Sequence, residues 1–380
     1  MGQGPLAGLR VVELMGLGAA PFAAMVLADL GADVVRVERV GRGADVLGVT
    51  QDPLARGRRS IAVDLKRAEG VELVLRLVER SDVLVEGFRA GVTERLGLGP
   101  EDCLARNPRL VYGRLTGWGQ DGPLAPRAGH DINYISLAGA LEPIGRPGRP
   151  PVPPLNLVGD FGGGGMLLAM GVLAALYERE NSGRGQVVDA AMVDGAALLT
   201  TMLHGMRAAG AWSGGRGENL LDGGAPYYDT YQTADGRYVS IGALEEKFYA
   251  ELLRLLELDP ADLPDRDDTA RWPELREKIA AAVRRRSRDE WAELAVASDA
   301  CLAPVLEPGE APDHPHNRKR QTFVDVAGTV QPAPAPRFGR TPASTPAPPP
   351  HPGADTDTVL AELGLPAEEV RRLRAEGLVG

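Results

Sequence analysis

The sequence predicts an α/β protein with a Rossmann-like large domain and a second, smaller α+β domain. Residues 1–120 alternate short β-branched runs with segments whose apolar residues recur at helical spacing, which is typical of a parallel sheet covered by helices. The composition changes near Ala208, where a glycine-rich, weakly periodic stretch begins. A chain of 380 residues with 44% hydrophobic residues supports two domains or one large one, and it is long enough to build a sizeable core without a disulfide or a metal.

The large domain begins with strands and helices in alternation. The expected strands are Leu9–Leu14, Asp33–Arg39, Ile61–Leu65, Asp82–Glu86 and Leu110–Leu115, all short apolar runs of the kind buried in parallel sheets. The expected helices are Pro21–Leu30, Arg67–Arg80 and Gly91–Leu96. Farther along, residues 166–179 are expected to form a buried helix, and residues 187–193 form either another strand or the start of a helix.

The small domain is expected to follow the glycine-rich linker. Asp235-Gly236 is a favoured turn pair between two strand-like runs, so we expect a hairpin there. Helices fit Glu246–Leu256, Trp272–Ser287 and Asp289–Ser298. Nine prolines in residues 332–352 predict an extended linker, which two further helices follow at Asp355–Leu363 and Glu368–Glu376.

The composition argues against several classes of function. The 52 acidic residues outnumber the 42 basic ones, and the net charge of −10 disfavours nucleic-acid binding. Cys103 and Cys301 lie far apart, so neither a disulfide framework nor a zinc site is expected, and a reducing compartment fits. The longest uncharged apolar stretch, residues 161–177, is shorter than a membrane span, and the first residues lack the features of a signal peptide. We therefore expect a cytoplasmic protein with no membrane or nucleic-acid partner.

A glycine-containing loop follows the first expected strand. Gly16 and Gly18 precede Glu38 by about 20 residues, which is the spacing of dinucleotide-binding loops. However, Pro21 occupies the place where that motif needs a third glycine for close helix packing. A nicotinamide cofactor is therefore not expected.

Basic residues gather after the second and third expected strands. Residues 36–66 contain seven Lys or Arg against four Asp or Glu, a local charge of +3 within an acidic chain. Guanidinium groups suit phosphate oxygens, so this cluster predicts either a phosphate site or a solvated basic face. The residues concerned are Arg39, Arg42, Arg56, Arg58, Arg59 and Lys66.

His130 and Asp160 are candidate acid–base groups. His130 follows a Gly/Pro-rich loop and precedes an apolar run, which fits either an active-site loop or a hydrogen-bonded structural histidine. Asp160 lies between glycines at the start of a very apolar segment, where desolvation would raise its pKa. Asp160 is also a suitable helix N-cap, and the two roles are compatible.

Two methionine pairs have the i,i+4 spacing of one helix face. They are Met166 with Met170 and Met202 with Met206. Methionine is adaptable, so these pairs either line a path for an acyl chain or, as we favour from the sequence, pack in the core.

Several long motifs are similar to those of one known family. They are LADLGADVVRVER, GFRAGVTERLGLGPED, LTGWGQDGP, AGHDINYISLAGAL and PPLNLVGDFGGGGM. The first two resemble the family III CoA-transferase superfamily, and the others resemble its α-methylacyl-CoA racemases in particular. GGAPYYDTYQTADGRYVSIGALEEKFY and PAPRFGRTP extend the resemblance over nearly the whole chain.

The resemblance implies a fold and an assembly. The large Rossmann-like domain would contain both ends of the chain, and two chains would form an interlocked homodimer. The expected ranges are 1–207 for the N-terminal part of the large domain, 208–225 for a linker, 226–328 for the small α+β domain, 329–353 for a Pro-rich linker, and 354–380 for C-terminal helices that return to the large domain.

The resemblance also implies roles for individual residues. His130 of the GHDINY motif and Asp160 of the GDFGGG motif would be the catalytic acid–base groups, and Glu245 would support them. The residues implied to bind CoA are Arg39, Val63, Asp64, Leu65, Lys66, Gly87, Phe88, Arg89, Arg95, Gly129, Asp131, Ile132, Asn133 and Tyr134. The implied substrate is a 2-methyl-branched acyl-CoA.

Racemisation at the carbon α to a thioester fits this pair of groups. A proton must leave one face of that carbon and return to the other through an enolate, which two groups on opposite faces achieve. Histidine supplies a base with a pKa near neutrality, and a desolvated aspartate supplies an acid. Backbone N–H groups near residues 129–131 or 160–162 are expected to stabilise the enolate oxygen, and no metal or other cofactor is needed.

Two alternatives remain open at this point. In an acyl-CoA:carboxylate CoA-transferase, Asp160 would be the nucleophile and would form an anhydride and then a thioester. That chemistry does not require His130, so the presence of His130 favours the racemase. A CoA-thioester-binding protein without catalysis is the third interpretation, and it predicts the loss of His130 or Asp160, both of which are present.

Overall fold

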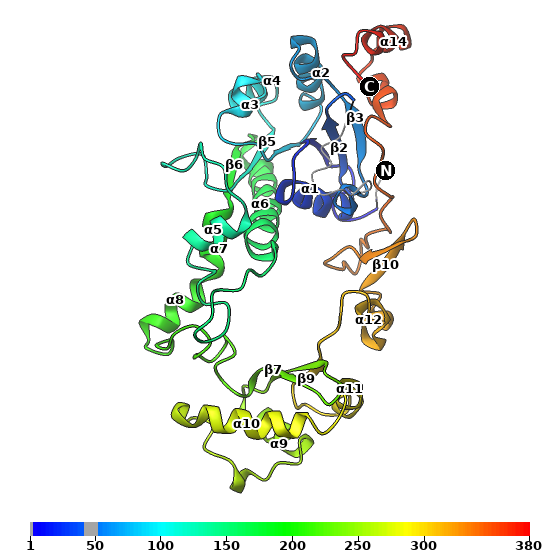
Figure 1. Cartoon of the computed structure of the whole chain (residues 1–380). Coiled ribbons are helices and arrows are strands. Elements are labelled where there is room, and N and C mark those ends of the chain that lie inside the picture. The colour runs from blue at the N-terminus through cyan, green and yellow to red at the C-terminus, as the bar shows by residue number, and fades with distance from the viewer. Residues whose placement is uncertain (1–2, 42–51) are drawn as a thin grey trace. The chain divides into compact units, whose positions relative to one another are not determined.

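The computed structural model describes residues 3–41 and 52–380 (Figure 1). The chain separates into two compact units. The large unit comprises Met1–Ala138, Leu155–Leu199 and His316–Gly380, and the small unit comprises Gly139–Pro154 and Thr200–Pro315. Each unit contains its own buried apolar side chains.

An all-parallel, six-stranded sheet forms the centre of the large unit. Its strand order is β3-β2-β1-β4-β5-β6, which is that of a doubly wound Rossmann-like sheet and confirms the predicted fold class. The first five strands coincide with the predicted ones to within a few residues, and the open choice at 187–193 proves to be a strand that leads directly into a helix. The strands are β1 (Arg10–Leu14), β2 (Asp33–Glu38), β3 (Arg59–Ala62), β4 (Val83–Glu86), β5 (Val111–Thr116) and β6 (Val187–Ala191).

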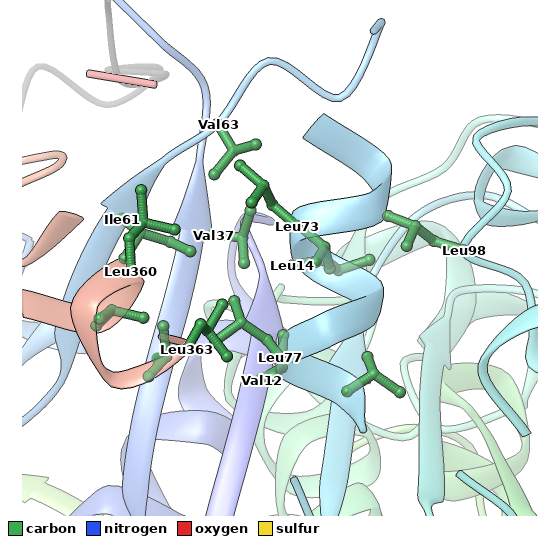
Figure 2. Packing of buried hydrophobic residues seen from close by; sticks show 14 of the residues in the cluster. Val12, Leu14, Val37, Ile61, Val63, Leu73, Leu77, Leu98, Leu360 and Leu363 are labelled. Atoms are coloured by element: carbon green, nitrogen blue, oxygen red, sulfur yellow. The ribbon is translucent and has the colours of Figure 1, made fainter. Parts of the chain in front are cut away.

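Helices cover both faces of this sheet. The main helices of the large unit are α1 (Ala19–Asp29), α2 (Ala68–Val78), α3 (Val92–Arg95), α4 (Pro100–Arg106), α5 (Asp131–Leu137), α6 (Leu167–Ser182), α7 (Met192–Leu199), α13 (Thr356–Glu362) and α14 (Ala367–Ala375). Because side chains alternate along a strand, Val12 of β1 belongs to one apolar cluster and Val11 to the other. Figure 2 shows the first cluster, where side chains of β1, β2 and β3 pack against α2 and against Leu360 and Leu363 of the C-terminal region. Helices α1 and α6 supply the second cluster.

A π-helix, η2 (Leu157–Met166), leads into α6 and carries four consecutive glycines. These glycines permit close packing, because a Cβ on Gly163 would lie 2.7 Å from the Ala196 nitrogen of α7. Likewise, a Cβ on Gly165 would lie 2.7 Å from the carbonyl oxygen of Ala19 in α1. The glycine run therefore brings η2 against both helices.

Together η2 and α6 form a helical run of 26 residues, Leu157–Ser182. Within the part of the chain that the structure describes, this is the one helix long and apolar enough to cross a membrane by length and composition. One face of it is core, since Leu168 and Val172 pack against Gly113 of β5. On its other face Met166 and Met170 are exposed, so the prediction that these two methionines pack in the core is wrong.

The small unit is an α+β fold around the antiparallel sheet β7-β8-β9. Its strands are β7 (Tyr228–Gln232), β8 (Tyr238–Gly242) and β9 (Leu302–Pro304), and its helices are α8 (Thr201–Ala208), α9 (Glu246–Leu255), α10 (Trp272–Val283) and α11 (Arg288–Ala295). β7 and β8 form the predicted hairpin, and Gly236 in its turn has φ +78°, which favours glycine. Leu252 of α9, Ile279 of α10 and Trp291 of α11 are fully buried in the apolar cluster of this unit.

The bounds of the two units differ from the predicted domain ranges. Residues 139–154 belong to the small unit, where Arg146 forms an ion pair with Asp229 at 2.7 Å. The predicted linker 208–225 is part of that same unit. The hairpin of β10 (Phe323–Val326) and β11 (Thr329–Pro332) belongs to the large unit, because Gln331 there accepts a hydrogen bond from Arg56 at 2.8 Å. The remaining short elements are α12 (Pro315–Arg320) and the 3₁₀ turns Pro53–Ala55, Pro260–Asp262, Thr269–Arg271 and Ala311–Asp313.

Candidate active site

The carboxyl ends of β1 to β4 border a cavity of about 830 Å³. In a doubly wound sheet the ligand crevice opens where the strand order reverses, which here is between β1 and β4. A volume of this size is typical of small-molecule sites. Seven of the predicted CoA-binding residues line it: Arg39, Val63, Asp64, Leu65, Lys66, Gly87 and Phe88.

Three arginines of the basic cluster are not available to a ligand. They form ion pairs within the large unit: Arg56 with Asp29, Arg58 with Glu13, and Arg59 with Asp33. Arg56 and Arg58 are also buried. For Arg56 and Arg58, both the phosphate-site and the solvated-face predictions are wrong, because carboxylates within the fold neutralise these buried side chains. For Arg59, which is partly exposed, only the phosphate-site prediction is wrong, because Asp33 already pairs with it.

The other basic residues near the cavity are exposed and have no ion pair within the described residues. Arg39 and Lys66 line the cavity, and Arg89 and Arg95 follow β4. Arg42 lies outside the described residues. Unpaired cations at the mouth of a cavity attract anionic groups such as phosphates.

The loop that follows β4 is held by a buried ionic network. Glu86 lies opposite Arg114 of β5, and the two side chains pair at 2.9 Å. The second carboxylate oxygen of Glu86 accepts the N–H of Phe88 at 2.7 Å. Burial raises the pKa of Glu86, while the Phe88 amide and Arg114 act in the opposite direction. The network thus fixes the segment that carries three of the predicted CoA-binding residues.

His130 immediately precedes α5. Its main-chain N–H donates to Oδ1 of Asn133 at 3.1 Å, and its carbonyl accepts the N–H of Asn133 at 2.8 Å. Its side chain is exposed, and in residues 3–41 and 52–380 the imidazole has no hydrogen-bond partner. This geometry gives no support to the interpretation of His130 as a hydrogen-bonded structural histidine.

Asp160 lies in η2, beside α5 and beside the loop that follows β1. Its N–H donates to Oδ1 of Asp131 at 2.7 Å, and its own Oδ2 accepts from Nδ2 of Asn156 at 3.2 Å. A Cβ on Gly18 would lie 3.1 Å from Oδ2 of Asp160, and Gly18 has φ +65°. Gly18 therefore leaves room for this carboxylate, and the neighbouring Leu17 lines the cavity.

The environment of Asp160 alters its acidity. Burial raises the pKa of Asp160 above 3.8, and the hydrogen bond from Asn156 opposes that rise. The negative charge of Asp131 raises this pKa further, whereas His130 lowers it. The structure therefore brings His130 and Asp160 within electrostatic reach of each other. Asp160 is not a helix cap, because Asn156 occupies the N-cap of η2.

The remaining predicted CoA-binding residues form the turn into α5 and its first residues: Gly129, Asp131, Ile132, Asn133 and Tyr134. In this turn the structure reduces the number of candidate N–H donors for the enolate oxygen. The amides of Asp160 and Phe161 already donate, to Asp131 and to the carbonyl of Asn156. The amides of Asp131 and Ile132 have no acceptor in the part of the chain that the structure describes.

Glu245 lies in the small unit, between β8 and α9. Its carbonyl accepts the N–H of Tyr249 at 2.9 Å. Its side chain is exposed and has neither a hydrogen bond nor an ion pair among the described residues.

Asn156, Gly18 and the burial of Asp131 are features of the site that the sequence did not indicate. Asn156 precedes Asp160 by four residues, and that helical spacing was a signal that could have found it. Asp131 was implied to bind CoA, yet its side chain is only 6% exposed and Oδ1 is engaged by the Asp160 amide. Oδ2 of Asp131 is buried and has no partner in the described chain.

The whole chain is similar to several known proteins. The family CoA-transferase family III matches residues 6–356. The chain is 48% identical to alpha-methylacyl-CoA racemase of Mus musculus and 45% identical to that of Homo sapiens, and each alignment covers 98% of this chain and 97% of the relative. The crystal structure of a CaiB/BaiF family protein from Brucella suis is similar with a TM-score of 0.83 and 28% identity, over 95% of this chain and 100% of that one. The chain belongs to the CoA-transferase family III.

Proposed function

We propose that this chain is an α-methylacyl-CoA racemase, which interconverts (R)- and (S)-2-methylacyl-CoA thioesters through an enolate. The observation that carries the proposal is the pairing of an exposed imidazole, His130, with a desolvated carboxyl group, Asp160, on adjoining elements. Similarity over the whole chain to proteins named alpha-methylacyl-CoA racemase supports this activity over CoA transfer.

The chemistry needs one base and one acid on opposite sides of the α-carbon. In one direction, neutral His130 removes the α-proton, and the electrons of the broken C–H bond form the enolate. Asp160 then donates its proton to the other face and becomes a carboxylate. In the opposite direction Asp160 is the base and protonated His130 is the acid. The raised pKa of Asp160 suits this role, because it makes the protonated form more accessible near neutral pH.

The enolate oxygen needs donors that are already in place. The unoccupied amides of Asp131 and Ile132 support the turn at residues 129–131 as the oxyanion site, in preference to residues 160–162. These donors lie next to His130 in the chain. The proposed chemistry uses only side chains and main-chain amides, so we propose no metal or other cofactor.

The cavity at the carboxyl edge of the sheet is the proposed CoA site. Its unpaired cations, Arg39 and Lys66, would face the phosphates, and the backbone of 63–66 and 87–89 would contact the rest of the nucleotide. Arg95 and residues 129–134 complete the proposed CoA contacts. The cavity is lined by Leu17, and the adjacent Gly18 lies close to the Asp160 carboxylate, which supports a pose with the thioester end of the ligand near the acid–base pair.

The large unit exposes an apolar surface on elements that contact one another. Exposed large side chains occur on α5, η2, α6 and α7: Leu137, Leu157, Met166, Met170, Tyr177 and Leu198. Exposed large apolar side chains that gather on neighbouring elements are typical of an interaction surface. We propose that a second copy covers it in a homodimer, that its methionines contact acyl chains of varied shape, and that Glu245 is supplied to the site from the second copy. A cytoplasmic location without membrane or nucleic-acid partners stays a prediction.

The proposal is tested with one enantiomer of a 2-methylacyl-CoA in D₂O, without an acceptor acid. Mass spectrometry measures deuterium at the α-carbon, and chiral analysis measures inversion. We expect deuterium gain together with loss of optical purity, and we expect His130→Ala and Asp160→Ala to abolish racemisation. A matched variant, His351→Ala, changes an exposed histidine outside the site and is expected to retain activity.

Two other outcomes identify the alternatives. If no exchange occurs, but CoA moves to an added carboxylate in an Asp160-dependent reaction, the chain is a transferase with Asp160 as the nucleophile. If neither reaction occurs and acyl-CoA binds equally well to both alanine variants, the chain is a binding protein.

A further inference from the structure

The Glu245 side chain is exposed and forms neither a hydrogen bond nor an ion pair among the described residues, so the fold positions it chiefly through its backbone. The backbone around it is tied at both ends. The N–H of Ala243 donates to the carbonyl of Tyr227 at 2.9 Å, and the N–H of Tyr249 donates to the carbonyl of Glu245 at 2.9 Å. Since a peptide group is planar, any contact that holds the Leu244 carbonyl also orients the N–H of Glu245.

Arg266 holds that carbonyl. Its Nη2 donates to the carbonyl oxygen of Leu244 at 2.6 Å. Its guanidinium also lies over two aromatic rings, 4.0 Å from the ring centroid of Tyr227 and 4.5 Å from that of Tyr249. The carbonyl of Arg266 accepts the indole N–H of Trp272 at 2.8 Å, which fixes the main chain at this point. A planar guanidinium can lie flat on a ring while the N–H groups at its edge donate, whereas an ammonium group has no planar face to stack.

The partners of Arg266 are the residues that tie the Glu245 segment. Tyr227 accepts from Ala243, and Tyr249 begins the second turn of α9 by donating to Glu245. Arg266 therefore contacts both residues that hold the segment, Tyr227 and Tyr249, and also the carbonyl of Leu244 within it. Nη1 of Arg266 is buried and has no hydrogen-bond partner in the described residues. Burying an unpaired donor costs free energy, and an apolar side chain in the same space would avoid that cost.

We propose that Arg266 is a positioning residue for Glu245, and that it acts on the reaction only through that carboxylate. The inference rests on the proposed function, in which Glu245 supports the acid–base pair. Arg266 would fix the direction in which the start of α9 presents Glu245, without touching the substrate.

The test is a double-mutant cycle between Arg266→Met and Glu245→Gln, read out as kcat and KM for α-deuterium exchange. We expect R266M to lower kcat roughly tenfold with KM changed less than about twofold, and to add less than about twofold when E245Q is already present. Arg266→Lys keeps the charge and a donor and is expected to recover part of kcat. If the effects of R266M and E245Q multiply, Arg266 acts independently of Glu245 and the proposal is wrong.

A second measurement separates this proposal from the racemase proposal. Amide hydrogen exchange in residues 243–249 should be faster in R266M than in the wild type, even if the wild type racemises nothing. Unchanged exchange there would overturn the role of Arg266 by itself. Should R266M fail to fold, R266K carries both measurements. Arg254→Met removes an exposed α9 arginine that pairs with Glu251, and it is expected to change neither readout.

Discussion

Two sets of basic side chains in the large unit both lie in the Lys/Arg-rich segment 36–66, yet one set is buried and ion-paired and the other is exposed and unpaired within the described residues. Arg58 is fully buried and pairs with Glu13, which is itself inaccessible to solvent. Arg39 and Lys66 are exposed, line the cavity, and have no ion pair within the described residues. The first set stabilises the sheet, whereas the second is available to a ligand.

The comparison teaches that charge alone does not identify a phosphate site. A buried arginine already satisfied by a carboxylate gains little from a phosphate, because the ligand would have to displace its partner. An exposed arginine beside a cavity has its donors free. Pairing therefore separates the two roles better than local net charge does.

The largest effect is expected at the buried set. Arg58→Met would leave the buried carboxylate of Glu13 without its main partner, and the loss should be about 3–5 kcal/mol in free energy of unfolding. Urea denaturation measures it. Adding Glu13→Gln should recover part of that loss, since the buried carboxylate is then removed and Arg36 still pairs with Glu38. A loss below about 1 kcal/mol would mean that Arg36, which lies 3.6 Å from Glu13, suffices alone.

Arg114 should combine both roles, because it is buried and also supports the loop after β4. Arg114→Met should lower the free energy of unfolding by about 2–3 kcal/mol at pH 7 and raise KM through the displaced Phe88 segment. Burial raises the pKa of Glu86 above 4.5. The contribution of Glu86 to stability therefore falls as pH rises from 4.5 through the folded pKa. Removing Arg114 should raise the pKa of Glu86 further, because Arg114 lowers it in the wild type. The loss in free energy of unfolding caused by Arg114→Met should therefore be smaller at pH 5 than at pH 7. Equal losses at both pH values would contradict this account of Glu86.

At the exposed set the effect should fall on binding and not on stability. Arg39→Met should raise KM for acyl-CoA about tenfold, or about 1.4 kcal/mol, and should leave the free energy of unfolding within about 0.5 kcal/mol of the wild type. The dependence of KM on salt should weaken in the variant, because one phosphate contact is lost. As a control, Arg374→Met removes an exposed arginine paired with Asp357 and should leave KM unchanged. A stability loss in R39M with unchanged KM would place Arg39 in the structural set.

The alternation of strands and helices was readable from the sequence because buried parallel strands are short branched runs, and each of the five predicted strands exists. The unit boundaries were not readable. Gln331 joins the large unit through Arg56, 275 positions away in the chain, and Arg146 joins the small unit through Asp229. Such contacts leave no local pattern of hydropathy.

The sequence identifies His130 and Asp160 as candidate acid–base residues, whereas the residues that surround them could not be predicted from it. His130 lies in the motif GHDINY and Asp160 in GDFGGG, and these motifs carry the resemblance to the family. The positions of the two residues in the fold are consistent with the proposed chemistry. That Gly18 makes room for Asp160, and that Asp131 is buried against the Asp160 amide, depends on how η2 packs against α1 and α5. The exposure of Met166 and Met170 was missed for a related reason, since apolar spacing does not tell which face of a helix meets the sheet.

Asp160 extends the comparison to a partly buried carboxylate that has no cation bonded to it. Its folded pKa lies above 3.8, chiefly because of burial, so its contribution to stability falls as pH rises from that value through the folded pKa. Asp160→Asn removes that penalty. The variant should therefore match the wild type in free energy of unfolding near pH 4 and exceed it at pH 7 by about 1 kcal/mol or less, although it should not racemise. Urea denaturation at the two pH values measures the difference.

Removing a charge from the unpaired site should thus stabilise the fold, whereas removing Arg58 from its pair should destabilise it. An Asp160→Asn variant that is less stable at pH 7 than at pH 4, relative to the wild type, would show that the carboxylate is stabilised by its surroundings, and it would weaken the case for Asp160 as the proton donor.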